Sequence, residues 1–346
     1  MLSCGAANLL AQEPVPSSED SMAVFEDLFV DEEPLNMTLT TDFKNLKKKR
    51  RQEEYQPAEM TIHVDESFEV SRPVRIKTRG IYRLNNCTNP PIWLNIRHSD
   101  IEVDSLDEVV RMKVVLRCRD SKQYDDYVLR EYLVYKLYNL LTPVSYRVRL
   151  IQMKIVDTGK KNDVNESWAF LVEPDTLMEM RLQGRMIRSD RLSMNVVNRE
   201  MMDRFAMFSY MVGNSDYSIT GRHNVRMVAL QNPGDMQGFL VIPYDFDYTG
   251  LVNASYAVPD ERGQELGITH VRDRYYLGPC RNTEVFQEVV DELASHKEEI
   301  LDYIRNFEYL DEKEKKDIID YLTSYFEEAG KEDFVRWQIE PTCRDY

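Results

Sequence analysis

Hydrophobic and polar positions alternate in short runs through the first half of the chain, and turns containing Asn, Pro or Asp separate these runs. An alternating run of this length predicts a half-buried strand. The predicted strands cover residues 35–41, 60–64, 73–80, 91–96, 112–117, 146–156 and 166–172. We therefore expect a strand-rich first part built around an antiparallel sheet.

Helical spacing of apolar residues interrupts and then follows these strands. Residues 124–141 place Leu129, Leu133 and Leu137 on one face, which predicts a helix inserted between the fifth and sixth strands. Residues 196–212 have the same spacing, and residues 283–328 read as two acidic amphipathic helices whose carboxylates form solvated faces. The pattern predicts an α+β chain in which strands come first and helices dominate later.

Composition and charge remove several classes of protein. The 346 residues carry 44 Lys and Arg against 60 Asp and Glu, a formal net charge of -16, which disfavours a nucleic-acid partner. No stretch of consecutive apolar residues reaches the length of about 18 to 20 that a membrane-spanning helix needs, so we do not expect an integral membrane protein. The five cysteines form no CxxC pair, so a structural zinc site is not expected.

The first 34 residues are acidic, lack periodicity and predict a flexible leader. Their opening resembles a truncated secretory signal, and Leu-Ser-Cys4 resembles the end of a lipoprotein signal, so a signal peptide and an extracytoplasmic location are expected, with a cytoplasmic one still open. Farther on, Asp42 predicts the cap of a short helix that carries the cationic run 47–51. That run is compatible with a phosphate-binding patch, although a solvated helix end is the favoured interpretation.

The most informative stretch joins a loop to a hairpin. The helix at 196–212 leads into a loop that carries Asn214, Asp216, His223 and Asn224. Two strands, interrupted by the turn at 232–235, then leave the loop and return to Asp245 and Asp247. Because paired strands lie about 4.8 Å apart, the open ends of the hairpin are neighbours, and we expect these carboxylates to share one pocket.

An acidic pocket of this kind suits phosphoryl transfer from ATP with magnesium, in which catalysis is mostly positioning and charge neutralisation. Asp216 fits the general base, while Asn224 and Asp245 supply the hard oxygen ligands that magnesium prefers. Asp247 is a second ligand or a loop-ordering acceptor, and His223 buttresses the loop. Any one of these residues alone is more often a simple turn residue, so the hypothesis depends on the set.

A phosphotransferase also needs a cation on the nucleotide phosphates. Lys113 lies in the strand before the helix at 124–141, and Glu131 on that helix is its candidate ion-pair partner. Lys77 and Arg79 are rival phosphate cations, because Gly80 is suited to start a tight loop over the nucleotide. The alternative interpretation is that Lys113 and Glu131 are ordinary surface residues, Lys113 on the solvated face of a strand and Glu131 on the solvated face of a helix. No GxGxxG motif is present.

The order YVLREYLVYKLYNLL, RVRL, GNSD, HN and IPYDFD resembles the CotH-like kinases over residues 73–247. The resemblance implies an atypical two-lobed protein-kinase-like fold and a secreted or surface-associated enzyme that phosphorylates Ser and Thr on a protein acceptor with Mg-ATP. It also implies that Asp216 is catalytic, that Asn224 and Asp245 hold magnesium and that Lys113 contacts ATP. The usual Trp-Asp pair is Tyr244-Asp245 here.

These expectations give a leader at 1–34, a strand-rich N-lobe at 35–175, and a catalytic loop, hairpin and mainly helical C-lobe at 176–346. The alternative function is a non-catalytic surface or coat protein that uses a kinase-like scaffold for binding. A metal-dependent hydrolase is disfavoured by the few histidines, and nucleotidyl transfer stays open beside phosphoryl transfer. Cys87 and Cys118 are equally compatible with a disulfide and with two free thiols.

Overall fold

The computed structural model describes residues 28–52, 54–63, 68–80, 82–96, 111–188, 193–234 and 236–345. The candidate signal sequence and Cys4 therefore lie outside the described residues. The last part of the predicted leader, residues 28–34, packs against the rest of the chain. Phe29 is buried, and the carboxylate of Asp31 accepts a hydrogen bond from Arg149 at 2.7 Å.

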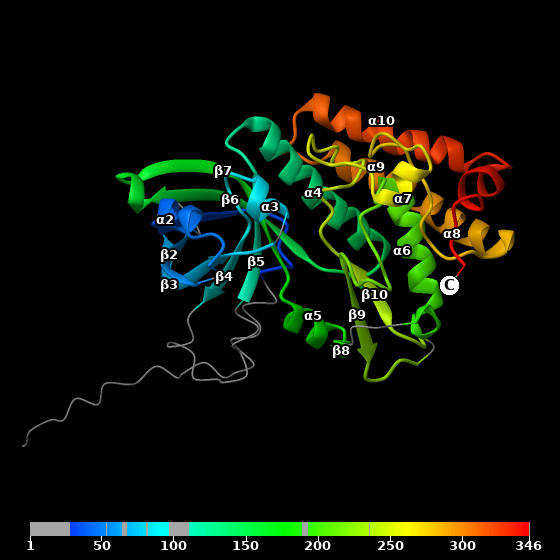
Figure 1. Ribbon diagram of the computed structural model, residues 1–346, viewed down its shortest axis with the longest axis horizontal. Helices are drawn as coiled ribbons and strands as arrows, with labels where there is room; N and C mark the ends of the chain where they lie inside the picture. The colour runs from blue at the N-terminus through cyan, green and yellow to red at the C-terminus, as the bar shows by residue number, and fades with distance from the viewer. Residues whose placement is uncertain are drawn as a thin grey trace, which may run out of the picture.

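Seven strands of the first half form a closed barrel (Figure 1). They are β1 (Leu35–Thr41), β2 (Gln56–His63), β3 (Glu69–Thr78), β4 (Ile92–Ile96), β5 (Arg111–Leu116), β6 (Val148–Asp157) and β7 (Asp163–Val172). Their order around the barrel is β1-β2-β3-β4-β5-β7-β6. The barrel closes where β1 pairs with β6 in parallel, from Leu35 opposite Ile151 to Thr41 opposite Asp157. Alternate side chains such as Ile76, Leu94 and Met112 fill its interior.

The closed barrel corrects the predicted architecture. The mixture of helices and strands agrees with the α+β prediction, but the two-lobed protein-kinase-like fold is wrong as a description of this chain, because the strand-rich part is a closed barrel rather than an open antiparallel lobe. The sequence pattern identified β1 and β6 as strands but could not reveal their pairing, which joins segments more than a hundred residues apart. Parallel neighbours leave no hairpin signal in a sequence.

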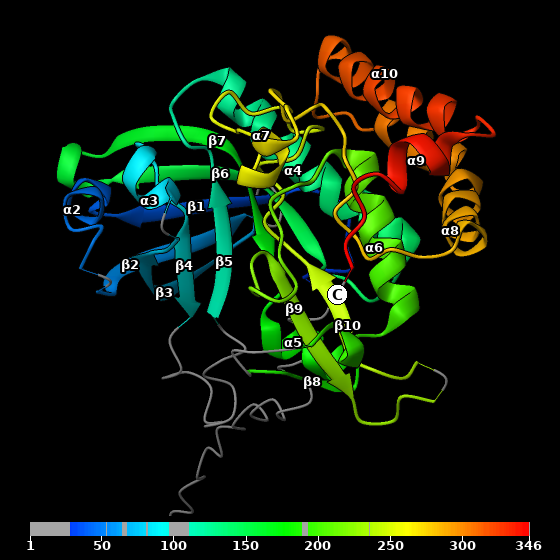
Figure 2. The same cartoon turned by 45° about the vertical axis from the view of Figure 1, so that its right-hand side comes forward.

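The described residues of the barrel half include three α-helices. The long helix α4 (Lys122–Leu141) packs between the barrel and the second half of the chain, where Leu133 and Leu137 are fully buried (Figure 2). The short helices are α2 (Phe43–Lys48) and α3 (Tyr82–Asn86). Asp42 caps α2 by accepting a hydrogen bond from the Asn45 N–H at 2.8 Å, as predicted.

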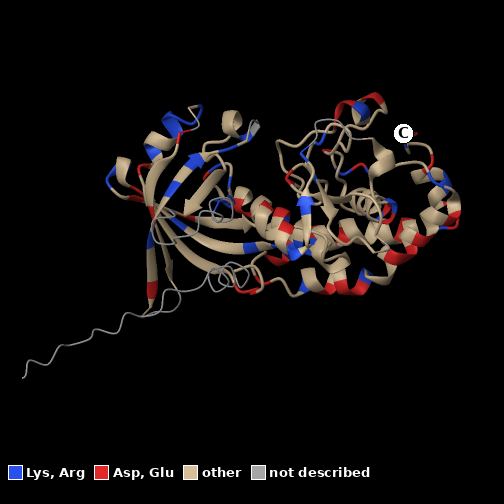
Figure 3. Ribbon diagram, turned by 90° about the horizontal axis from the view of Figure 1, so that it is seen from below, with Lys and Arg blue, Asp and Glu red and all other residues tan. Residues whose placement is uncertain are grey.

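The second half combines a small sheet with helices. Its elements are α5 (Asp175–Arg181), β8 (Gly184–Met186), α6 (Arg199–Val212), β9 (Val225–Leu230), β10 (Leu240–Pro243), α7 (Glu261–Glu265), α8 (Thr283–Ser295), α9 (Lys297–Arg305) and α10 (Glu312–Ala329). The strands form an antiparallel sheet in the order β10-β9-β8. The acidic region at 283–328 contains three helices, α8, α9 and α10, rather than the predicted two. In Figure 3 many Asp and Glu positions, coloured red, lie along the helices of this half.

Two disulfides link segments that are distant in the sequence. Cys87 and Cys118 form one of the two states that the sequence left open, a bridge between the segment after α3 and the end of β5. Cys280 and Cys343 form a second bridge, which the sequence analysis did not predict. In the described ranges, no helix combines the length and apolar character that crossing a bilayer requires.

Candidate active site

Two loops of the second half are held together at the end of α6. Gly213 ends α6 in a left-handed conformation (φ 69°), and an added Cβ there would lie only 3.1 Å from the Cα of Gly250. The main chain of the second loop docks here, because the Gly250 N–H donates to the Gly213 carbonyl at 2.9 Å and the Leu251 N–H donates to the Val212 carbonyl at 3.0 Å. The segment after Asp247 therefore lies beside the segment that carries Asp216.

The first loop converges on the carboxylate of Asp216. The Asn224 side-chain amide donates to the Asp216 carbonyl at 2.8 Å and to its Oδ2 at 2.9 Å. His223 Nε2 lies 2.8 Å from Asp216 Oδ1, and this hydrogen bond raises the pKa of His223. Asn214 Oδ1 accepts a hydrogen bond from the Asp216 N–H at 3.1 Å. The four residues predicted on this loop are therefore brought together around one acid.

The predicted hairpin is confirmed. Strands β9 and β10 pair antiparallel with Val225 opposite Pro243, and the Tyr244 N–H donates to the Asn224 carbonyl at 3.0 Å. Asp245 thus follows directly after the residue paired with Asn224. Its own N–H donates to the hydroxyl of Tyr135, on α4, at 2.8 Å.

Asn224 and Asp245 both adopt left-handed backbone conformations, with φ of 53° and 66°. Asn and Asp tolerate this region better than other residues with a Cβ, so the residue types match the backbone. Residues in such conformations concentrate at functional sites, where the surrounding structure holds them. Here the two positions lie on adjoining loops, joined by the hydrogen bond from Tyr244 to Asn224.

Asp247 is buried on the second loop. Its side chain is 5% exposed and accepts a hydrogen bond from the Tyr256 hydroxyl at 3.1 Å. Burial raises the pKa of Asp247, the charge of Asp245 adds to the rise, and the guanidinium of Arg83 opposes it. Asp216 also contributes to this rise, and both Asp216 and Asp245 raise the pKa of His223. The acids from the two loops therefore share one electrostatic environment, which we call the acidic loop cluster (Asp216, Asn224, Asp245 and Asp247).

Lys113 is a buried cation without a hydrogen bond. It lies on the outer face of the barrel, and its Nζ makes no hydrogen bond to any described residue although the side chain is only 7% exposed. Its nearest carboxylate is Asp175, at 4.0 Å, and the ring centroid of Tyr244 lies 4.4 Å away. Burial lowers the pKa of Lys113 to about 8. A buried cation that has only this long ion pair and no hydrogen bond is costly unless it serves a ligand.

The suggested ion pair between Lys113 and Glu131 is not formed. Glu131 is buried on α4 and faces Arg83, whose Nη1 lies 3.8 Å from its Oε2. Burial raises the pKa of Glu131, and the charge of Asp247 adds to the rise. Lys113 and Glu131 therefore line the same region but have different partners.

The two rival cations lie on the same outer face of the barrel. Trp93 is the cross-strand neighbour of both Lys77 and Lys113. The Lys77 ammonium lies 5.0 Å from the ring of Tyr55, whereas the Arg79 guanidinium lies 5.4 Å from that of Trp93. The charge of Arg79 acts on both Lys113 and Glu131, so Arg79 is the rival cation nearer to the site.

A pocket of about 250 Å³ opens beside Lys113, where the barrel joins the second half. We call it the linker pocket, since its wall includes the connection between β7 and α5. It is lined by Trp93, Arg111, Lys113, Glu173, Pro174, Asp175, Thr176, Glu179, Met186, Arg188, Arg222 and Arg226. The amino group of Lys113 thus lies between a pocket of mixed polar and apolar character and the start of the second acidic loop.

Sequence reasoning missed several residues of this site. Arg83, Asp175 and Tyr135 contact the predicted residues. Arg83 and Asp175 come from short helices with no motif around them, whereas Tyr135 lies on the predicted long helix but nothing in its spacing marked it as a site residue. Asp175 offers a weak signal, because it follows Glu-Pro at the end of a strand. Arg226 also lines the pocket, where its Nη1 donates to the Tyr244 hydroxyl at 2.6 Å. These contacts arise from tertiary packing.

The donor set suits a magnesium ion that phosphates help to bind. Within the described ranges, no three His, Cys, Asp or Glu side chains cluster closely enough to hold a metal by themselves. Magnesium commonly takes one or two carboxylates and completes its shell with water and phosphate oxygens. The Asn224 amide nitrogen is occupied by Asp216, which leaves its carbonyl oxygen free to bind a metal, and the mutual repulsion of Asp245 and Asp247 favours a cation.

Comparison with solved structures gives a distant structural likeness. The chain is similar to the Helicobacter pylori proinflammatory kinase CtkA, with a TM-score of 0.37 and 10% sequence identity over 72% of this chain and 89% of that chain. No protein-family model and no curated protein sequence matches the chain. The functional conclusion therefore depends on the geometry of the site.

Proposed function

We propose that this chain is a CotH-like phosphotransferase that moves the γ-phosphoryl group of Mg-ATP to a Ser or Thr hydroxyl of a protein acceptor. One observation carries the proposal. Asn224 donates to Asp216 through its side-chain nitrogen and pairs through its main chain with the residue before Asp245. A candidate base, an amide oxygen and a carboxylate therefore come together from two loops, which is the arrangement that phosphoryl transfer uses.

Each residue then has a role set by its surroundings. Asp216 accepts the proton of the acceptor hydroxyl as its oxygen bonds to the γ-phosphorus and the bond to the bridging oxygen of ADP breaks. His223 and Asn224 hold the carboxylate of Asp216 in one orientation. Asn224, Asp245 and Asp247 would hold magnesium, which neutralises phosphate charge when bound. Lys113 binds the phosphates, with Arg79 as the second cation.

The linker pocket is the proposed place of the nucleoside. Pro174 and Met186 offer apolar surface, and Lys113 lies where the pocket approaches Tyr244 and Asp245. A nucleotide in this position would extend its phosphates from Lys113 toward the acidic loop cluster. A phosphate oxygen would also give the buried ammonium of Lys113 the hydrogen-bond acceptor that the described residues do not provide.

We also propose an extracytoplasmic location. Two disulfides among the described residues support it, because such bonds persist in oxidising compartments and are uncommon in the cytosol. Protease protection of the protein in intact cells, before and after permeabilisation, tests this location.

Labelled nucleotides test the proposed activity. The purified chain is incubated with magnesium and either γ-labelled or α-labelled ATP, with and without a Ser-rich acceptor. Label from the γ position alone supports phosphoryl transfer, whereas label from the α position indicates nucleotidyl transfer. No label from either position on the chain or the acceptor, with the fold intact, would contradict the proposal.

A further inference from the structure

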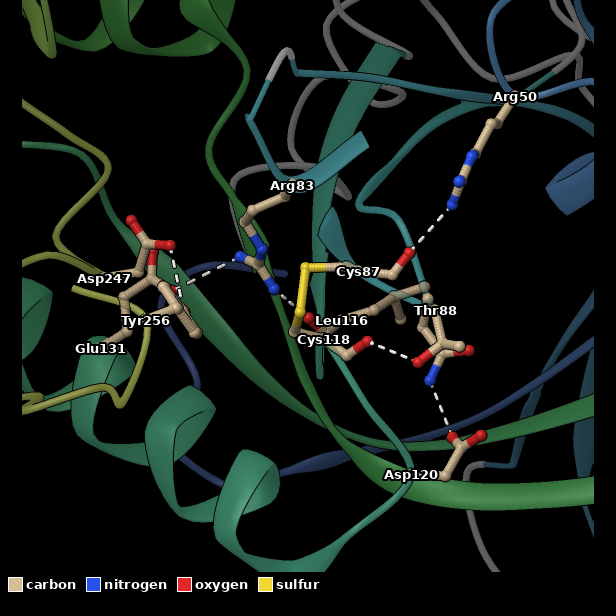
Figure 4. The surroundings of a disulfide bond; sticks show 11 residues. Arg50, Arg83, Cys87, Thr88, Leu116, Cys118, Asp120, Glu131, Asp247 and Tyr256 are labelled. Atoms are coloured by element: carbon tan, nitrogen blue, oxygen red, sulfur yellow. Dashed lines mark hydrogen bonds and ion pairs between the residues drawn. A yellow bond between two sulfur atoms is a disulfide. The ribbon is translucent and has the colours of Figure 1, made fainter. Parts of the chain in front are cut away.

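Arg83 is a further cation that reaches the site from the barrel half of the chain. Arg83 is in the short helix α3, and its side chain is 10% exposed. Its Nη1 lies 3.8 Å from Glu131 Oε2, and its Nη2 donates to the main-chain carbonyl of Leu116, at the end of β5. Figure 4 shows the guanidinium between the Cys87–Cys118 disulfide and the carboxyl groups of Glu131 and Asp247.

Arg83 faces acids from two separate elements. Glu131 comes from α4 and Asp247 comes from the loop after β10. Glu131 is 2% exposed, and its Oε1 has no hydrogen-bond partner among the described residues. Without the guanidinium, two buried carboxylates would repel each other in a region of low dielectric. The charge of Arg83 therefore offsets the charges of both acids, one on α4 and one on the loop after β10.

The position of Arg83 depends on a small element with little support of its own. Helix α3 has five residues, too few for a stable isolated helix. Directly after it, Cys87 forms a disulfide with Cys118, two residues beyond the Leu116 carbonyl that Arg83 contacts. The crosslink thus joins the residue after α3 to the segment just beyond β5, the strand that carries Lys113.

Hydrogen bonds around this disulfide reinforce the attachment. The Asn89 N–H donates to the Cys118 carbonyl at 3.0 Å, and the Thr88 hydroxyl donates to the same carbonyl at 3.2 Å. From the other side, Arg50 donates to the Cys87 carbonyl at 3.0 Å. These bonds surround a covalent link, and breaking the link would leave the attachment of α3 to noncovalent contacts.

We infer that Arg83 is a positioning residue of the proposed transfer and that the Cys87–Cys118 disulfide holds it in place, so that reduction of this disulfide lowers activity. The inference rests on the proposed function. In the reduction step, a dithiol gives two electrons and two protons, the sulfur–sulfur bond breaks, Cys87 and Cys118 become thiols, and the dithiol becomes a disulfide.

Two sets of variants of the full-length chain test the inference. The first is Arg83→Gln with Arg83→Lys, and its control is Arg149→Gln, which removes a similarly buried barrel arginine whose partner is Asp31. The second is Cys87→Ser/Cys118→Ser, and its control is Cys280→Ser/Cys343→Ser. Each protein is assayed for kcat, for KM for Mg-ATP and for thermal midpoint, below the lowest midpoint of the set.

We expect Arg83→Gln to lower kcat about 100-fold with a small change in KM, the size of loss that misplacement by about 1 Å can cause. Arg83→Lys should recover part of kcat, because it restores the charge. Cys87→Ser/Cys118→Ser should lower kcat in the same direction, whereas both controls keep the parent kcat. A purely structural role would instead lower the thermal midpoint of Arg83→Gln and Arg149→Gln alike and leave kcat unchanged.

Three outcomes would overturn the inference. One is a folded Arg83→Gln variant with the parent kcat, and another is a Cys87→Ser/Cys118→Ser variant with the parent kcat. The third is an equal loss of kcat in Arg83→Gln and Arg149→Gln. If Cys87→Ser/Cys118→Ser does not fold, the kcat values of Arg83→Gln and Arg83→Lys decide whether Arg83 is a positioning residue. An inactive parent chain overturns the proposed function itself, and an active parent with unaffected variants overturns only the inference.

Discussion

Asn224 donates its side-chain amide to both the carbonyl and the carboxylate of Asp216, at 2.8 and 2.9 Å. This one side chain fixes the proposed base and leaves its own carbonyl oxygen available to a metal. Because Asn224 also pairs with Tyr244 across the hairpin, it sets the distance between the first loop and Asp245. The properties of the site should therefore be sensitive to this residue.

We expect Asn224→Ala to lower kcat by about 10- to 100-fold, the usual cost of removing a residue that orients or ligates a metal-site group. The matched control is Asn162→Ala. Asn162 has a similar left-handed backbone (φ 61°) but lies in the turn between β6 and β7, so this variant has the same backbone strain without touching the site. Equal kcat losses in the two variants would assign the effect to strain and contradict the role of Asn224.

The buried ammonium of Lys113 predicts a pH dependence. Burial lowers its pKa to about 8 in the folded chain, so the charged form is present below that pH and is lost above it. We expect kcat/KM for ATP, which reports the free enzyme, to fall as the pH rises through about 8. Lys113→Arg should remove this fall, because arginine stays charged. A fall at the same pH in Lys113→Arg would assign it to another group.

The same shift predicts an effect on stability. Between about pH 8 and the higher pKa of a lysine in the unfolded chain, Lys113 is protonated in the unfolded chain but has lost its proton in the folded chain. Because the unfolded state then binds more protons than the folded state, Lys113 makes the free energy of unfolding rise with pH over this range. At pH 7 the buried charge is unfavourable. Lys113→Met should therefore raise the thermal midpoint of the ligand-free chain, whereas Lys154→Met, on the exposed face of β6, should not. A lower midpoint in Lys113→Met would show that its ring contacts outweigh the burial of the charge.

Asp245 is predicted to couple magnesium to nucleotide binding. A ligand at 100 times its Kd stabilises the folded chain by about 2.7 kcal/mol, so Mg-ATP should raise the thermal midpoint of the parent. We expect Asp245→Asn to lose most of this rise while keeping its ligand-free midpoint, since asparagine tolerates the same backbone conformation. Asp302→Asn, on the exposed side of α9, is the control. Full stabilisation of Asp245→Asn by Mg-ATP would reject its role as a ligand.

Local sequence patterns predicted the hairpin that joins the two loops, but they did not predict the closed barrel. The hairpin and the loop before it are contiguous in the sequence, and a hairpin brings its ends together whatever surrounds it, so the meeting of Asn224 and Asp245 was predictable. Barrel closure was not, because β1 and β6 pair in parallel across a long separation. Arg83 was missed for the same reason, since only tertiary packing brings α3 next to α4.

Intact-mass measurement of the chain after incubation with Mg-ATP, for the parent and for Asp216→Asn, tests the central claim most directly. Asparagine keeps the shape of the side chain but cannot accept the hydroxyl proton, so general-base catalysis of about 10²- to 10⁴-fold should be lost. We predict that the parent, and the Asp302→Asn control, gain the mass of one or more phosphoryl groups and that Asp216→Asn gains none in the same time. Equal phosphorylation of the parent and folded Asp216→Asn would contradict the account.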